Sequence, residues 1–228
     1  MMKIAINGLG RVGRATFKIV TSSPELELVA INDLVAADNL AYLLNYDTVY
    51  GRFPNRVTAA DGDLTMSDRL YRVFAEQDPA RLPWGELGVD LVFECTGLFT
   101  TKDELTRHLQ AGAKRVILSA PAQDHDIPTV VYGVNPYRES DGPILSCASC
   151  TTNCIAPIVE IIDRRLGIQK AVMNTTHAYT ASQAIVDKPN QKWRRGRAGA
   201  MNLVPSGTGA AVATTRALPQ LTGKFAGT

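Results

Sequence analysis

The sequence predicts an α/β fold built on a doubly wound, mainly parallel sheet. Short apolar segments of the length of buried strands alternate with segments of helical periodicity over much of the chain. A glycine-rich turn, Gly8 to Gly13, joins the first of these strands to the first helix. Because parallel strands need crossover connections, this alternation is typical of a sheet with helices on both faces.

The individual elements follow from apolar periodicity and from the turn residues that bound it. The first helix, for example, ends before Ser22-Ser23-Pro24, since proline disfavours helix in the residue that precedes it. We expect strands at residues 3–7, 26–32, 70–74, 89–95, 116–119, 130–134, 144–147 and 171–176, and helices at residues 11–20 and 102–111.

The pattern changes after the strand at residues 144–147. That strand runs into Ala148-Ser149-Cys150, and apolar residues then recur at helical spacing from Ile155 to Leu166. We place a domain boundary here, with residues 1–149 in the first domain and residues 150–228 in the second.

Composition limits the class of protein. The 228 residues, of which 45% are hydrophobic and 20% charged, can form one large domain or two small ones. A net charge of +2 does not favour nucleic-acid binding, and the local basic cluster of Lys192, Arg194, Arg195 and Arg197 suits either a solvated loop or an anion site. No apolar run approaches the ~18 residues of a membrane span, and the N-terminus does not resemble a signal peptide. We therefore expect a cytoplasmic protein.

The chain has four cysteines, Cys95, Cys147, Cys150 and Cys154. Structural disulfides are not expected in a chain without secretory features. Cys147 and Cys150 have the spacing of a redox or zinc-binding pair, but zinc needs about four ligands and no second pair follows at finger spacing. We predict no metal site.

The glycine-rich turn indicates a dinucleotide site. Gly8, Gly10 and Gly13 permit a tight turn and close approach of backbone N–H groups to a pyrophosphate. Asp33 ends the second strand, where a carboxylate accepts hydrogen bonds from the adenosine ribose. That acid would repel the 2′-phosphate of NADP, so NAD is favoured. The alternative is an ordinary strand-to-helix turn, with Asp33 capping the next helix.

Cys150 is a candidate nucleophile because it precedes an amphipathic helix, whose N-terminus favours a thiolate. Pro157 predicts that this helix starts late or kinks. As partners we considered His108 on a solvated helix, His125 in a polar loop and His177 at the end of a strand. His177 is the one that can meet Cys150 if both follow strands of one sheet, while a structural histidine stays the alternative.

Residues 148–154, Ala-Ser-Cys-Thr-Thr-Asn-Cys, resemble the active-site signature of glyceraldehyde-3-phosphate dehydrogenases. Further segments resemble the family in the family's order, at residues 5–14, 46–51, 94–97, 119–122, 175–180 and 208–211. The resemblance implies a Rossmann-type NAD-binding domain followed by an α+β catalytic domain. It also implies oxidation of D-glyceraldehyde 3-phosphate with NAD and inorganic phosphate to 1,3-bisphosphoglycerate, through a thioester.

By this resemblance Cys150 attacks the aldehyde and His177 acts as the base. The positions that match the family's site for the attacking phosphate are Ser149, Thr151, Thr208 and Gly209, and Thr180 matches one for the phosphate of the substrate. The cofactor positions are Asn7, Gly8, Gly10, Arg11, Val12, Asp33, Gln77, Thr96 and Ser119, with Gln77 standing where relatives often have arginine. Residues 179–201 match a loop that reaches a neighbouring subunit's cofactor in a homotetramer.

The resemblance also shows departures. Relatives continue beyond residue 228 into a segment with an arginine for the substrate phosphate, so we expect an incomplete catalytic domain, and a chain that folds poorly and has little activity on its own. Two alternatives are an erythrose-4-phosphate dehydrogenase, which usually departs from the His-Ala-Tyr-Thr pattern present at residues 177–180, and a non-catalytic NAD- or RNA-binding fragment.

Overall fold

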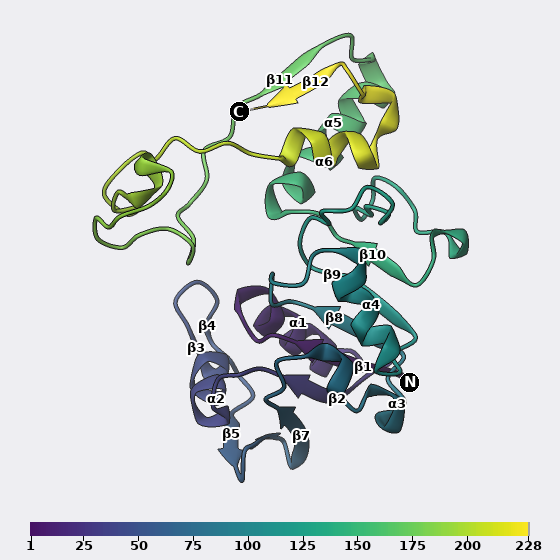
Figure 1. Ribbon diagram of the computed structural model, residues 1–228, viewed down its shortest axis with the longest axis vertical. Helices are drawn as coiled ribbons and strands as arrows, with labels where there is room; N and C mark the ends of the chain where they lie inside the picture. Colours follow the sequence, from purple (N-terminus) through teal and green to yellow (C-terminus); the bar gives the residue numbers. More distant parts are fainter. Residues whose placement is uncertain (228) are drawn as a thin grey trace. The chain divides into compact units, whose positions relative to one another are not determined.

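In the computed structural model, which describes residues 1–227, the chain divides into two compact units (Figure 1). Unit 1 comprises Met1–Val130 and Pro136–Ala148, and unit 2 comprises Val131–Asn135 and Ser149–Thr228. The division therefore falls one residue before the position expected from the sequence. In addition, the short segment Val131–Asn135 belongs to unit 2 although the residues on both sides of it belong to unit 1. No helix within residues 1–227 combines the length and the apolar character needed to cross a bilayer.

The described part of unit 1 is built on an eight-stranded sheet in the order β10-β9-β8-β1-β2-β7-β6-β5. Neighbours from β10 to β7 pair in parallel, and β7, β6 and β5 continue the sheet as antiparallel hairpins. The strands are β1 (Met2–Asn7), β2 (Leu26–Asn32), β5 (Val57–Ala60), β6 (Asp63–Met66), β7 (Arg69–Phe74), β8 (Leu91–Glu94), β9 (Arg115–Leu118) and β10 (Ile144–Ser146).

Alternate residues of a strand face opposite sides of the sheet, and in this sheet the residues on both sides are buried. In β1, Ile4 and Ile6 belong to one buried cluster, while Ala5 belongs to another. The first cluster includes residues of α1 (Arg11–Ser22) and α2 (Ala37–Asn45), and the second includes Trp84 of α3 (Trp84–Leu87). The predicted doubly wound α/β fold is confirmed.

The fourth helix, α4 (Lys102–Gln110), begins at a capping box. The Thr101 side chain accepts from the Glu104 backbone N–H, and the Glu104 carboxylate accepts from the Thr101 backbone N–H. The prediction that His108 lies on a solvated surface of this helix is wrong, since His108 is 0% exposed. Remaining short elements of unit 1 are β3 (Tyr46–Asp47), β4 (Gly51–Arg52), η1 (Pro79–Arg81) and η2 (Glu139–Asp141).

The strand expected at residues 130–134 does not form. The chain makes a single bridge there, from Thr129 to Ser146, and then turns. The Val134 N–H donates to the Val131 carbonyl, and Gly133 has a φ of +76°, so the extended path ends. Apolar residues alone did not distinguish this turn from a strand.

Unit 2 is organised around α5 (Cys150–Leu166) and α6 (Ala210–Ala217), which pack together. Val159 of α5 and the buried Leu218 and Leu221 form the core of this unit. The other elements are β11 (Ala171–Met173), η3 (Trp193–Gly196), η4 (Pro219–Leu221) and β12 (Phe225–Gly227), with β11 and β12 paired in parallel. The predicted strand at 171–176 is thus shorter, and the residues beyond Met173 form a loop.

Candidate active site

Cys150 is the first residue of α5, so its thiol lies at the N-terminal end of the helix. The preceding Ser149 caps the helix, with its Oγ accepting from the Thr152 backbone N–H at 3.0 Å. Pro157 neither delays the start of the helix nor ends it, since α5 runs to Leu166. Ala148 has a φ of +60°, a left-handed conformation that costs a residue with a Cβ roughly 1–2 kcal/mol and turns the chain just before the nucleophile.

Cys150 and His177 meet within unit 2. The Cys150 Sγ lies 3.3 Å from His177 Nε2, and His177 Nδ1 lies 2.6 Å from the Ala178 carbonyl oxygen. Because a carbonyl only accepts, Nδ1 carries a proton, and in the neutral ring Nε2 is left as an acceptor facing the thiol. The ring is therefore oriented to remove the proton of Cys150.

The electrostatics of the pair favour a thiolate and an imidazolium. The hydrogen bond with His177 lowers the pKa of the Cys150 thiol, with help from the Thr151 hydroxyl and backbone N–H against the opposing effect of burial. The hydrogen bond to Ala178 raises the pKa of His177, and the neighbouring Cys150 raises it further. By contrast, burial raises the pKa of Cys95 to about 11 and also raises that of Cys147. Cys150 is thus activated, whereas Cys95 and Cys147 are not.

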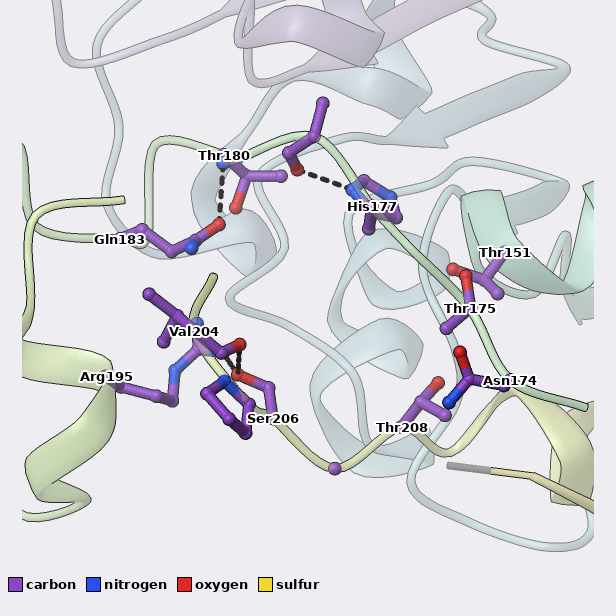
Figure 2. Close-up of a pocket in the computed structure, with 13 residues that line it drawn as sticks. Thr151, Asn174, Thr175, His177, Thr180, Gln183, Arg195, Val204, Ser206 and Thr208 are labelled. Atoms are coloured by element: carbon purple, nitrogen blue, oxygen red, sulfur yellow. Dashed lines mark hydrogen bonds between the residues drawn. The ribbon is translucent and has the colours of Figure 1, made fainter. Parts of the chain in front are cut away.

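His177 borders a polar cavity of about 410 Å³ (Figure 2). Arg195 reaches this cavity and donates to the hydroxyls of Ser206 at 2.8 Å and Ser182 at 3.4 Å. A guanidinium beside several hydroxyls is a suitable environment for a phosphate. The lining residues are Thr151, Asn174, Thr175, His177, Ala178, Thr180, Gln183, Arg195, Val204, Pro205, Ser206, Gly207 and Thr208.

The cavity brings together three of the five residues predicted to bind phosphate groups, namely Thr151, Thr180 and Thr208. The other two lie at helix starts: the Ser149 hydroxyl is engaged in the cap of α5, and Gly209 is the residue before α6. Thr180 is held in place, because its backbone N–H donates to Gln183 Oε1 at 3.0 Å.

The sequence does not single out Arg195 from the basic cluster. The structure separates the members of this cluster: Arg195 is half-buried against the cavity, whereas Lys192, Arg194 and Arg197 are exposed. A loop without periodicity carries no signal for which side of the chain each arginine faces.

A second cavity, of about 540 Å³, lies in unit 1 at the carboxyl ends of β1 and β2. Its shape depends on the glycines. Gly8 has a φ of +91°, and a Cβ on it would lie 2.8 Å from the Thr96 backbone N. A Cβ on Gly13 would lie 1.9 Å from the Gly8 carbonyl oxygen. The lining residues are Asn7, Gly8, Gly10, Asn32, Asp33, Leu34, Glu76, Gln77, Cys95, Thr96, Leu98 and Phe99.

The residues of this cavity fit a dinucleotide. Asp33 stands at the end of β2 with its carboxylate fixed by the backbone N–H groups of Leu9, at 2.6 Å, and Val35, at 2.9 Å. A glycine-rich turn beside a carboxylate is the arrangement that receives a pyrophosphate and an adenosine ribose. Of the nine predicted cofactor residues, Asn7, Gly8, Gly10, Asp33, Gln77 and Thr96 line the cavity.

The three other predicted cofactor residues do not line it. Arg11 forms an ion pair with Asp47, and Val12 is 49% exposed. Ser119 lies near the buried Cys95 thiol and opposes the rise of its pKa.

The sequence matches a known family over most of its length. Residues 2–102 match the family model described as glyceraldehyde 3-phosphate dehydrogenase, NAD binding domain, and residues 149–228 match the model of the C-terminal domain of the same family. The chain is 46% identical to glyceraldehyde-3-phosphate dehydrogenase 1 of Bacillus subtilis and to glyceraldehyde-3-phosphate dehydrogenase A of Escherichia coli, in each case over 99% of this chain and 68% of the relative. It is also 46% identical to glyceraldehyde-3-phosphate dehydrogenase of Clostridium pasteurianum, over 100% of this chain and 69% of that protein.

The chain therefore spans about two thirds of the length of these relatives, and within that span the similarity includes the turn that shapes the cavity of unit 1 and the segment that carries Cys150 and His177. From this identity, together with the two family models, we conclude that the chain belongs to the glyceraldehyde-3-phosphate dehydrogenase family.

Proposed function

We propose that this protein oxidises D-glyceraldehyde 3-phosphate with NAD and inorganic phosphate, giving 1,3-bisphosphoglycerate, a reaction of glycolysis. The observation that carries the proposal is the Cys150–His177 pair, whose 3.3 Å contact and fixed ring orientation provide an activated nucleophile and its base. The relatives named above support the triose phosphate as substrate over erythrose 4-phosphate.

In the first step, His177 Nε2 takes the thiol proton, the Cys150 sulfur bonds to the aldehyde carbon, and the proton passes from His177 to the former aldehyde oxygen, which becomes a hydroxyl. The resulting hydroxyl gives its proton to the histidine as its carbon is oxidised to a thioester. Bound NAD would supply the acceptor for the hydride that leaves this carbon. An oxygen of inorganic phosphate then attacks the thioester carbon, the carbon–sulfur bond breaks, and the thiolate of Cys150 is regenerated beside His177.

The cavity beside His177 supports the handling of two phosphate groups. We assign Ser149, Thr151, Thr208 and Gly209 to the attacking phosphate, as the family resemblance implies, and Thr180 to the phosphate of the substrate. To these we add Arg195, since it is a cation that lines the same cavity as Thr151, Thr180 and Thr208. Hydroxyls and a guanidinium together offer the charge-assisted hydrogen bonds that phosphate oxygens need.

The cavity in unit 1 supports residues 1–149 as the NAD-binding domain, and residues 150–228 then form part of the catalytic domain. Asp33 would receive the ribose, and the turn around Gly8 and Gly10 would receive the pyrophosphate. Asn7, Gln77 and Thr96 line the same cavity and complete its assignment, whereas Arg11, Val12 and Ser119 are assigned to the cofactor from the family resemblance alone.

We also propose a cytoplasmic homotetramer. The loop at residues 179–201 exposes several large apolar side chains, among them Ile185, Val186, Trp193 and Met201, which are 73–88% exposed. Such side chains on one loop are a suitable contact for a second subunit.

The proposal is tested with the variants Cys150→Ser and His177→Asn and the control Cys154→Ser, because Cys154 is also an exposed cysteine of α5, whereas the hydrogen bond with His177 is made by Cys150. Phosphate-dependent reduction of NAD with each aldehyde is followed by absorbance. We expect Cys150→Ser to abolish it, His177→Asn to reduce it by roughly 10²–10⁴-fold, and Cys154→Ser to keep it. Full activity in Cys150→Ser would contradict the proposal, and a preference for erythrose 4-phosphate would correct the substrate.

A further inference from the structure

A buried polar network lies beneath the cavity of unit 1. Its centre is Glu94, the last residue of β8, which is 0% exposed. Each of its carboxylate oxygens accepts two hydrogen bonds. Oε1 accepts from the Thr96 backbone N–H at 2.8 Å and from the Thr96 hydroxyl at 2.5 Å. Oε2 lies 2.5 Å from Asn7 Nδ2 and 3.0 Å from His108 Nε2.

One end of the network is fixed by Trp84. Its indole Nε1 donates to His108 Nδ1 at 3.0 Å, and both side chains are fully buried. An indole N–H can only donate, so His108 Nδ1 must accept and the proton of the ring must lie on Nε2. His108 therefore has to donate to Glu94.

The other end is fixed by the backbone of Glu76. Its N–H donates to Asn32 Oδ1 at 2.8 Å, and its carbonyl accepts from Asn32 Nδ2 at 2.9 Å. This pair sets the orientation of the Asn32 amide, whose Nδ2 also donates to Asn7 Oδ1 at 2.7 Å. With its oxygen engaged in this way, Asn7 has only N–H groups to direct at Glu94.

Donors thus converge on Glu94 from both ends, and only a carboxylate can accept all four. A glutamine has one acceptor oxygen, so its amide group would face the Thr96 backbone N–H in one orientation, or the N–H groups of Asn7 and His108 in the other, and at least one donor would be left unsatisfied. Three of the groups that this network orients, Asn7, Asn32 and Thr96, line the cavity, and Thr96 is also the residue against which Gly8 packs.

We propose that Glu94 is a positioning residue for the cofactor: it holds Asn7 and Thr96 in the orientations that shape the dinucleotide cavity, while Trp84 and His108 hold Glu94. The inference rests on the proposed placement of NAD in this cavity. It predicts that the hydrogen-bonding pattern, rather than the negative charge or the volume of Glu94, determines the affinity for NAD.

The first test needs no change to the network. In protein labelled with ¹⁵N-histidine, long-range proton–nitrogen spectra distinguish a protonated from an unprotonated ring nitrogen. The variants His125→Asn and His177→Asn each remove the signals of one other histidine, so the signals that remain in both spectra belong to His108. We expect a proton on Nε2 and none on Nδ1. A proton on Nδ1, or on both nitrogens, would overturn the proposed arrangement.

The second test compares Glu94→Gln with Glu104→Gln. Glu104 belongs to the same unit, but it accepts the backbone N–H groups of Thr100 and Thr101 with Oε2 alone, which a glutamine oxygen can also do. We expect NAD to bind about tenfold more weakly to Glu94→Gln, because Asn7 and Thr96 would leave their orientations to satisfy the lost contacts and would have to be restored when NAD binds, at about the cost of one hydrogen bond. Glu104→Gln should bind within about twofold of the unmodified chain, as expected for a change that keeps its hydrogen bonds.

Calorimetric binding of NAD is measured well below the unfolding temperature of each variant, together with the rate of Cys150 labelling by iodoacetamide, which reports on unit 2. A purely structural role would lower the unfolding temperature of Glu94→Gln while leaving NAD affinity equal to that of Glu104→Gln, and that result would overturn the proposal.

If Glu94→Gln does not fold, His108→Asn takes its place, because it removes one of the four donors to Glu94. A loss of about threefold in NAD affinity is expected for one hydrogen bond, and an unchanged affinity would again overturn the proposal. If neither the unmodified chain nor Glu104→Gln binds NAD, the cofactor assignment itself fails, whereas the spectra still report on the hydrogen bonds.

Discussion

Replacing His177 with asparagine isolates the contribution of the imidazole to the reactivity of Cys150. The hydrogen bond with His177 is the largest influence that lowers the pKa of the thiol, and the helix start and the Thr151 groups remain in the variant. A hydrogen bond to a charged group contributes about 1.5–3 kcal/mol, or roughly 10- to 150-fold in thiolate population. Because both side chains are exposed, solvent screening favours the lower limit, about tenfold.

The assay is the rate of iodoacetamide labelling at each cysteine as a function of pH, resolved by peptide mass spectrometry. A lowered pKa means that Cys150 reacts at a pH where an ordinary thiol is still protonated. The unmodified chain should therefore label at Cys150 about tenfold faster than His177→Asn near pH 6, and the two should converge at a pH where any exposed thiol is ionised. Cys95, whose pKa is raised to about 11, should label slowly throughout this range. Equal labelling of Cys150 in both proteins near pH 6 would refute the reasoning.

Three further predictions follow from single contacts. Arg195→Ala should raise the KM for the triose phosphate by about tenfold through loss of a charge-assisted contact, whereas the exposed neighbour Arg194→Ala should leave it unchanged in steady-state assays; equal effects would remove Arg195 from the site. Gly13→Ala, whose Cβ would lie 1.9 Å from the Gly8 carbonyl oxygen, should cost about 1–3 kcal/mol of unfolding free energy in denaturant titrations, whereas Gly10→Ala, whose Cβ meets no protein atom within 4 Å, should lose much less; equal losses would contradict the close contact. Ser149→Ala should lose about 1 kcal/mol of unfolding free energy with its helix cap, and Ser149→Asp should restore most of it in denaturant titrations; no loss in the alanine variant would dismiss the cap.

The sequence predicted most of unit 1 because its signals are local. β2 was expected at residues 26–32, where it is found, and α4 is one residue shorter than expected. Strand alternation, a capping box and glycines with a special conformation all act within a few residues. The segment at 130–134 was predicted as a strand because it is apolar. In the structure the pairing with β10 stops at the Thr129–Ser146 bridge, and the chain turns at Gly133.

The site required long-range information. The meeting of Cys150 and His177 was inferred from strand ends, yet β11 ends at Met173 and the histidine is positioned by the loop and by Ala178. His108 was expected in solvent because its helix is polar. In the structure it is buried and forms hydrogen bonds with Trp84, 24 residues away in the sequence, and with Glu94, 14 residues away. A buried polar residue with distant partners has no local pattern in the sequence.

The central claim is that the Cys150 sulfur carries the acyl group between oxidation and phosphate attack. It is tested most directly by mixing the protein with D-glyceraldehyde 3-phosphate and NAD in the absence of inorganic phosphate, quenching in acid, and locating the adduct by mass spectrometry. The account predicts a phosphoglyceryl adduct on Cys150 that disappears when phosphate is added, with formation of the acyl phosphate. An adduct at another residue, or NAD reduction without any adduct at Cys150, would contradict it.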